Sequence, residues 1–129
     1  MSKEIYLVHD DQEDPSTRIK FLEFAGYKVT VMQDAQRCLS MLENKVPSLI
    51  LTDILVHGMT GFDFCLAIRQ RFTPERLPVL LSSGIYKGSI YQEESRRVGA
   101  QGFMLAPVQL DELILKVNEL TGGLDSQAA

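Results

Sequence analysis

The stretch Ser48-Leu49-Ile50-Leu51-Thr52-Asp53 constrains the fold of this chain more than any other. Short, almost uniformly apolar runs of this kind are typical of parallel strands that are buried on both faces. Helices must then cover both faces of the sheet, so strands and helices should alternate along the chain. The run ends on a carboxylate, and open α/β sheets bind their ligands at the carboxyl ends of strands. Asp53 is therefore the first candidate for a functional residue.

Alternating strands and helices are indeed what the rest of the sequence predicts. Apolar runs predict further strands at residues 5–8, 27–31, 79–83 and 102–105. Helical spacing of apolar residues predicts helices at roughly 15–25, 35–42, 61–72, 89–98 and 110–120, with Asp34, Thr60 and Ser89 capping the middle three. Right-handed crossovers then give an α/β fold, a five-stranded parallel sheet of order 2-1-3-4-5 with helices on both faces. In that order the site lies between the first and third strands.

The length of 129 residues suits one domain with its own core. We expect this domain to span residues 1–121 and residues 122–129 to form a flexible tail or linker, because the tail has no apolar periodicity. Cys38 and Cys65 fall in predicted helices without paired metal spacing. They are expected to be buried, reduced thiols.

Charge and hydropathy exclude two classes of partner. The net charge of −4 argues against direct nucleic acid binding by this domain, since sequence-independent binding needs a basic face. No apolar run approaches the length of about 18 residues that a membrane span needs. The first residues also lack the apolar core of a signal peptide. We therefore expect a cytoplasmic protein that does not bind membranes.

Carboxylates follow the first predicted strand as well as the third. Asp10 and Asp11 come directly after residues 5–8, and the predicted topology brings them close to Asp53. Such carboxylates repel one another unless a cation lies among them, and oxygen ligands with room for water suit Mg²⁺ or Mn²⁺. Ser83 ends the fourth strand at the same edge, within reach of a bound phosphoryl oxygen. Taken alone, an acid pair after a strand also serves to cap the next helix, and the joint occurrence favours a site.

Five segments together resemble the receiver domains of two-component response regulators of the chemotaxis-regulator type, over roughly residues 3–121. They are Leu7-Val8-His9-Asp10-Asp11, Leu49-Ile50-Leu51-Thr52-Asp53, Gly58-Met59-Thr60-Gly61, Pro78-Val79-Leu80-Leu81-Ser82-Ser83-Gly84 and Gly102-Phe103-Met104-Leu105-Ala106-Pro107. The resemblance implies that Asp53 is the phosphoacceptor of a phosphorelay. A histidine kinase or a histidine phosphotransfer protein would supply the phosphoryl group from phosphohistidine. It also implies that Asp10, Asp11, Asp53 and the backbone carbonyl of Leu55 hold Mg²⁺.

The same resemblance implies how a signal would leave the site. Ser83 matches the switch hydroxyl, Phe103 matches the switch aromatic, and the bond before Pro107 would be cis. The surface of the fourth helix, fifth strand and fifth helix is the family's usual contact with an output domain or a second copy, and the sequence leaves that choice open. The chain would act as a signalling module and not as an enzyme.

One residue of the family pattern is missing. A lysine usually precedes the proline after the fifth strand, and this chain has Ala106 there. Alanine supplies neither a charge nor a hydrogen-bond donor, so we expect weaker stabilisation of the phosphoryl group and weaker coupling to the outer surface. Lys87, just after the fourth strand, is the local cation that the sequence offers as a substitute.

Three other functions compete with the phosphoacceptor. A degenerate receiver would act by phosphorylation-independent protein–protein interaction; Ala106 motivates this hypothesis and the three acids oppose it. A flavodoxin-like FMN-binding protein needs a hydroxyl- and glycine-rich loop after the first strand, where this chain has acids that would repel a phosphate. A phosphatase with an aspartyl nucleophile needs a second acid two residues further on, where this chain has Leu55.

Overall fold

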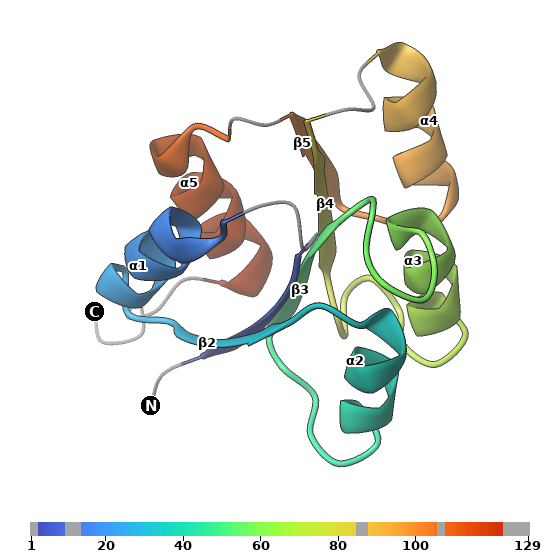
Figure 1. The fold of residues 1–129 in the computed structure, drawn as a ribbon, viewed down its shortest axis with the longest axis horizontal. Coiled ribbons are helices and arrows are strands. Elements are labelled where there is room, and N and C mark those ends of the chain that lie inside the picture. Colours follow the sequence, from blue (N-terminus) through green and yellow to red (C-terminus); the bar gives the residue numbers. More distant parts are fainter. Residues whose placement is uncertain (1–2, 10–13, 85–87, 106–107, 123–129) are drawn as a thin grey trace.

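The computed structural model describes residues 3–9, 14–84, 88–105 and 108–122. A parallel sheet of order β2-β1-β3-β4-β5 forms its centre (Figure 1). The strands are β1 (Glu4–Val8), β2 (Lys28–Met32), β3 (Leu49–Asp53), β4 (Val79–Ser83) and β5 (Gly102–Leu105). The predicted fold class and strand order are confirmed.

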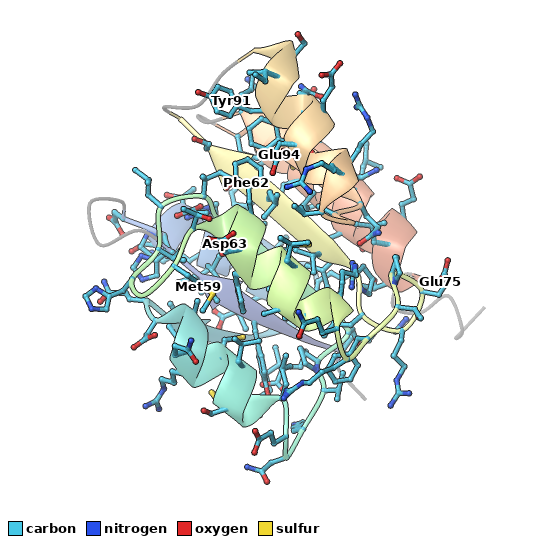
Figure 2. All side chains as sticks on the ribbon, turned by 90° about the vertical axis from the view of Figure 1, so that its right-hand side faces the viewer. Met59, Phe62, Asp63, Glu75, Tyr91 and Glu94 are labelled. Atoms are coloured by element: carbon cyan, nitrogen blue, oxygen red, sulfur yellow. The ribbon has the colours of Figure 1, made fainter. Side chains whose placement is uncertain are left out.

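Helices cover both faces of the sheet. The helices are α1 (Ser16–Phe24), α2 (Ala35–Met41), α3 (Gly61–Arg69), α4 (Ser89–Arg97) and α5 (Leu110–Thr121). Figure 1 shows α1 and α5 on one side and the other three on the opposite side. Figure 2 looks onto α3, with α2 below it and α4 above it. Among the described helices none is long and apolar enough to cross a membrane.

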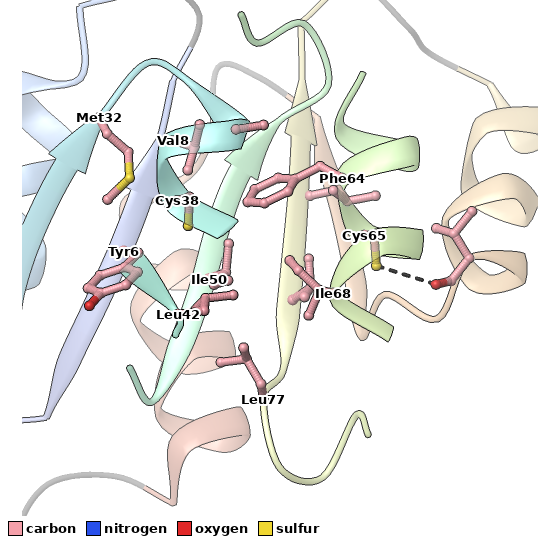
Figure 3. Packing of buried hydrophobic residues seen from close by; sticks show 14 of the residues in the cluster. Tyr6, Val8, Met32, Cys38, Leu42, Ile50, Phe64, Cys65, Ile68 and Leu77 are labelled. Atoms are coloured by element: carbon pink, nitrogen blue, oxygen red, sulfur yellow. Dashed lines mark hydrogen bonds between the residues drawn. The ribbon is translucent and has the colours of Figure 1, made fainter. Parts of the chain in front are cut away.

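Two apolar clusters, one on each face, hold these layers together. Side chains of the central strands point alternately into one cluster and the other. In β1, Tyr6 and Val8 join the cluster under α2, α3 and α4 (Figure 3). Ile5 and Leu7 join the one under α1 and α5. This two-sided burial is why β1, β3 and β4 have uninterrupted apolar sequences.

Helix starts agree with the sequence in two cases and differ in one. The Asp34 carboxylate accepts a hydrogen bond from the Gln36 backbone at 2.9 Å, and the Thr60 hydroxyl accepts one from Asp63 at 3.1 Å. The prediction that Ser89 caps α4 is wrong, because Ser89 is already the first residue of the helix. Its N-cap is Gly88, at φ +112°, where a side chain would strain the backbone.

The two cysteines are buried, as predicted, in the cluster under α2 and α3 (Figure 3). Burial raises the pKa of the Cys38 thiol to about 12 and that of Cys65 to about 11. The Cys65 thiol also donates a hydrogen bond to the Val98 carbonyl at 3.4 Å. Neither thiol therefore ionises near neutral pH while the chain is folded.

We expect both thiols to resist a disulfide reagent such as Ellman's in the folded protein and to react fully in denaturing urea. The absorbance of the released thiolate measures both reactions. Immediate reaction of either cysteine with the reagent in the folded protein would contradict the burial described above.

Candidate functional site

Asp53 is the last residue of β3, and β3 lies between β1 and β4 in the sheet. Val8 of β1 pairs with Thr52, and Ser82 of β4 pairs with Asp53 itself. The carboxylate residue is only 5% exposed. A nearly buried acid requires hydrogen-bond or ionic partners, because an unpaired buried charge is costly.

Two side chains from different elements reach the same carboxylate oxygen. The Ser82 hydroxyl donates a hydrogen bond to Asp53 Oδ1 at 2.8 Å. Arg18 Nη1 donates to the same oxygen at 3.3 Å, and the two residues form a buried ion pair. The carboxylate is thus held from β4 by a hydroxyl and from α1 by a positive charge.

Arg18 was not predicted from the sequence, which gave Lys87 as the substitute cation. Arg18 and Leu22, four residues apart on one face of α1, are the buried residues of that helix. Ile19, the apolar residue next to Arg18, is only half-buried. An arginine in line with Leu22 on the inner face of a helix was the signal that would have found it.

Ser83 and Ser82 lie next to each other on β4, and both are buried. Ser83 lies at the end of β4, at the same edge of the sheet as Asp53. Its role as a switch hydroxyl stays a prediction. Ser82 was missed. Successive residues of a strand face opposite sides, so the register of β4 against β3 decides which hydroxyl meets Asp53, and sequence alone does not give that register.

The loop after β3 folds back onto the strand end. The Gly61 backbone donates a hydrogen bond to the Ile54 carbonyl at 2.7 Å. A Cβ atom at Gly61 would lie 2.6 Å from the Asp53 carbonyl oxygen and 3.0 Å from the Ile54 Cα. Only glycine permits this approach, which sets the backbone of Asp53 and the start of α3 against each other.

The remaining predicted residues are placed in part. Phe103 is half-buried on β5 and packs against the cluster under α3. Leu55 is exposed and bridges to Thr60 across the loop. The other predicted or discussed positions lie outside the described residues, namely Asp10, Asp11, Lys87, Ala106 and Pro107, as does the tail from 123 to 129.

The predicted Mg²⁺ ligands agree in chemistry with a hard cation. All four are oxygen donors, three carboxylates and the Leu55 carbonyl, which is the set that Mg²⁺ prefers. Within the described ranges no group of three or more acidic, histidine or cysteine side chains could hold a metal, since two of the predicted ligands fall outside them. Arg18 beside Asp53 adds a positive charge, which would repel a bound cation.

The predicted partner surface carries exposed apolar side chains on each of its three elements. They are Ile90 on α4, Leu105 on β5 and Leu115 on α5. Val98, which follows the last residue of α4, is buried in the core. Which partner this surface contacts stays a prediction.

The fold and the buried carboxylate at the β1–β3 edge define a receiver-type signalling domain. Residues 5–118 match the response regulator receiver domain, and the chain belongs to that family. It resembles a CheY-like receiver domain protein from Methanospirillum hungatei JF-1, with 28% identity, a TM-score of 0.81 and 95% of each chain covered. A putative response regulator from Chloroflexus aurantiacus J-10-fl is 22% identical, with a TM-score of 0.85 and coverage of 95% and 99%. At 22% identity, the likeness to the Chloroflexus protein shows a shared fold.

Two curated relatives show how the chain compares with complete proteins. It is 32% identical to an uncharacterized 14.6 kDa protein of Leptolyngbya boryana (sodA1 3' region), covering 88% of this chain and 86% of that protein. It is 29% identical to the phosphate regulon transcriptional regulatory protein PhoB of Rhizobium meliloti (strain 1021), covering 88% of this chain and 50% of that protein. The chain thus spans half the length of this second relative. Family membership makes it a receiver domain of two-component signalling.

Proposed function

We propose that this chain is the phosphoacceptor module of a cytoplasmic phosphorelay and that Asp53 accepts the phosphoryl group. The observation that carries the proposal is the placement of Asp53, a nearly buried carboxylate at the β1–β3 edge with Ser82 and Arg18 on one oxygen. A carboxylate held in one orientation loses little entropy when it attacks an incoming group. Membership in the receiver family gives no support to FMN binding or to phosphatase activity.

The reaction is a transfer between two nucleophiles. An Asp53 carboxylate oxygen attacks the phosphorus of phosphohistidine, an O–P bond forms, and the N–P bond breaks with its electron pair going to the imidazole nitrogen. Ser82 and Arg18 orient the carboxylate, and Asp10, Asp11, Asp53 and the Leu55 carbonyl would hold Mg²⁺. The bound cation would offset repulsion between the carboxylate and the incoming phosphoryl oxygens. The donor protein supplies the phosphoryl group, and this chain receives it.

The Arg18–Asp53 pair also favours the second candidate, a receiver that works without phosphorylation. An internal cation already neutralises the carboxylate, and the family's lysine is absent. Such a domain would signal by protein contact in the state that the structure describes.

Intact-mass measurement after incubation with acetyl phosphate and Mg²⁺ tests the first candidate against the second. We expect the native protein to gain one phosphoryl group and Asp53→Asn, which keeps the shape and removes the charged nucleophile, to gain none. Asp63→Asn is the matched control, because Asp63 is an exposed acid on α3. It should load normally.

Omitting Mg²⁺ should also prevent the gain in mass. A native protein that never loads, from acetyl phosphate or from a phosphohistidine donor, would reject the phosphoacceptor and leave the degenerate receiver.

A further inference from the structure

We propose that Arg18 is the phosphoryl-binding cation of this domain, so that α1 supplies the charge that Ala106 does not. The inference rests on the proposed function and names the residue of the same site that would contact the transferred group. It concerns residues that the structure describes, Arg18, Asp53 and Ser82. It replaces the sequence-based suggestion of Lys87.

The distance between Arg18 and Asp53 is the first argument. Arg18 Nη1 lies 3.3 Å from Asp53 Oδ1 in the unmodified protein. Once an Asp53 oxygen carries phosphorus, the phosphoryl oxygens are only two bonds from that carboxylate oxygen. A guanidinium has five donors in a planar fork, so it can keep a donor on the carboxyl group and turn another to a phosphoryl oxygen.

Burial of the pair is the second argument. Arg18 is 9% exposed, and its side chain leaves α1 on the face that Leu22 packs into the core. By contrast, the cations of the Lys45–Glu4 and Arg97–Glu94 pairs have side chains that are 63% exposed. A charge withdrawn from water interacts strongly with a neighbouring anion, because salt and solvent screen it little.

The position of Arg18 on the helix is the third argument. An apolar side chain at the inner face of α1 would pack beside Leu22 at no electrostatic cost, whereas a buried guanidinium is costly unless it is paired. Replacing a buried ion pair by apolar groups is often neutral or stabilising. The fold therefore does not need an ion pair at this position, whereas an anion bound at Asp53 would need the cation.

The charge balance of the site is the fourth argument. A phosphoryl group adds a charge of about −1.5 to −2 to a site that already carries acids. The family places a lysine after the fifth strand to meet this charge, and the sequence has Ala106 at that position. Arg18 meets the same need from α1.

The test compares Arg18→Met, which keeps length and packing, and Arg18→Gln, which keeps a donor without the charge, with the native protein. Lys20→Met is the matched control, because Lys20 is an exposed cation on the same helix. Two quantities are measured: the initial rate of mass gain with acetyl phosphate, and the affinity for beryllofluoride, a phosphoryl analogue, by fluorine-19 NMR. We expect both Arg18 variants to lose about tenfold or more in rate and in affinity, since one charged hydrogen bond is removed. Lys20→Met should match the native protein.

A Mg²⁺ titration of the unloaded proteins distinguishes contact with the phosphoryl group from an effect through the acids. Removing a positive charge beside Asp53 should leave Mg²⁺ binding equal or tighter. Weaker Mg²⁺ binding by the same factor as the loss in loading would overturn the inference. Removing one partner of a buried ion pair lowers stability, so denaturant unfolding should first show that both Arg18 variants are folded under the conditions of the loading assay.

The two proposals fail in different ways. If the native protein and both Arg18 variants load equally well and bind beryllofluoride equally, or the variants load faster, Arg18 is not the phosphoryl-binding cation and the phosphoacceptor function stands. If the native protein itself does not load, the phosphoacceptor function is rejected and the inference with it.

Discussion

Gly61→Ala is expected to lower the free energy of unfolding by about 3 kcal/mol, as severe overpacking does. The added Cβ would lie 2.6 Å from the Asp53 carbonyl oxygen and 3.0 Å from the Ile54 Cα. Both are backbone atoms of the β3 end, and they cannot move aside without shifting Asp53. The substitution should therefore also slow the loading of Asp53. Urea unfolding measures the first effect and mass gain with acetyl phosphate the second.

Gly102→Ala is the matched control for this substitution. Its Cβ would lie 2.7 Å from the Leu80 Cδ1 and 3.0 Å from the Lys116 Cε. Those atoms are the far ends of side chains that can rotate, so the loss should be about 1 kcal/mol. Equal losses for the two glycines would show that the Gly61 approach to Asp53 is not what sets the cost.

Arg69→Met is expected to lower the free energy of unfolding by about 3 kcal/mol, because several charged hydrogen bonds are lost together. Arg69 ends α3, and its guanidinium donates to the Gly99 and Leu77 carbonyls, each at 2.8 Å, and to the Gln101 side chain at 2.7 Å. Gln101 in turn accepts from the Val79 backbone at 2.9 Å. One side chain thus connects α3 with the start of β4 and with the turn before β5.

Burial lowers the pKa of Arg69, although the guanidinium stays protonated at neutral pH. Its carbonyl partners would be left without their donor when methionine replaces it, which is the costly part of the change. Lysine at this position keeps the charge and loses the planar fork, so it should recover little of the stability. The free energy of unfolding from urea titration measures each variant.

Arg71→Met is the control, since Arg71 lies two residues further on and is exposed. It donates to the Leu39 carbonyl at 3.1 Å and lies 3.8 Å from Glu43. Exposed contacts of this kind contribute little, and we expect a loss of less than about 1 kcal/mol. A loss as large as that of Arg69→Met would mean that the hydrogen bonds from Arg69 to Gly99, Leu77 and Gln101 are not what stabilises the fold.

The sequence predicted the sheet well because its strands are buried on both faces. Such strands leave uninterrupted apolar runs, and alternation with helices then limits the topology to few choices. The edge that carries Asp53 followed from the same reasoning. Edge strand β2 was predicted from its alternation and begins one residue later than expected, at Lys28.

The partners of Asp53 could not be derived in the same way. Arg18 acts through a long side chain from a neighbouring element, and its role depends on how α1 is rotated against the sheet. Ser82 depends on the register between β3 and β4, which a pair of adjacent serines leaves undecided. The cap at Gly88 was missed because Gly88 starts the helix through its positive φ and not through a side chain.

The contact between α1 and Asp53 has a consequence for how this domain can diverge. Arg18 and Ser82 both precede the last third of the chain, which forms α4, β5 and α5. With the positive charge contributed by the first helix, the end of the fifth strand need not supply one. The C-terminal surface could then change with each new binding partner, while Arg18, Asp53 and Ser82 stay the same.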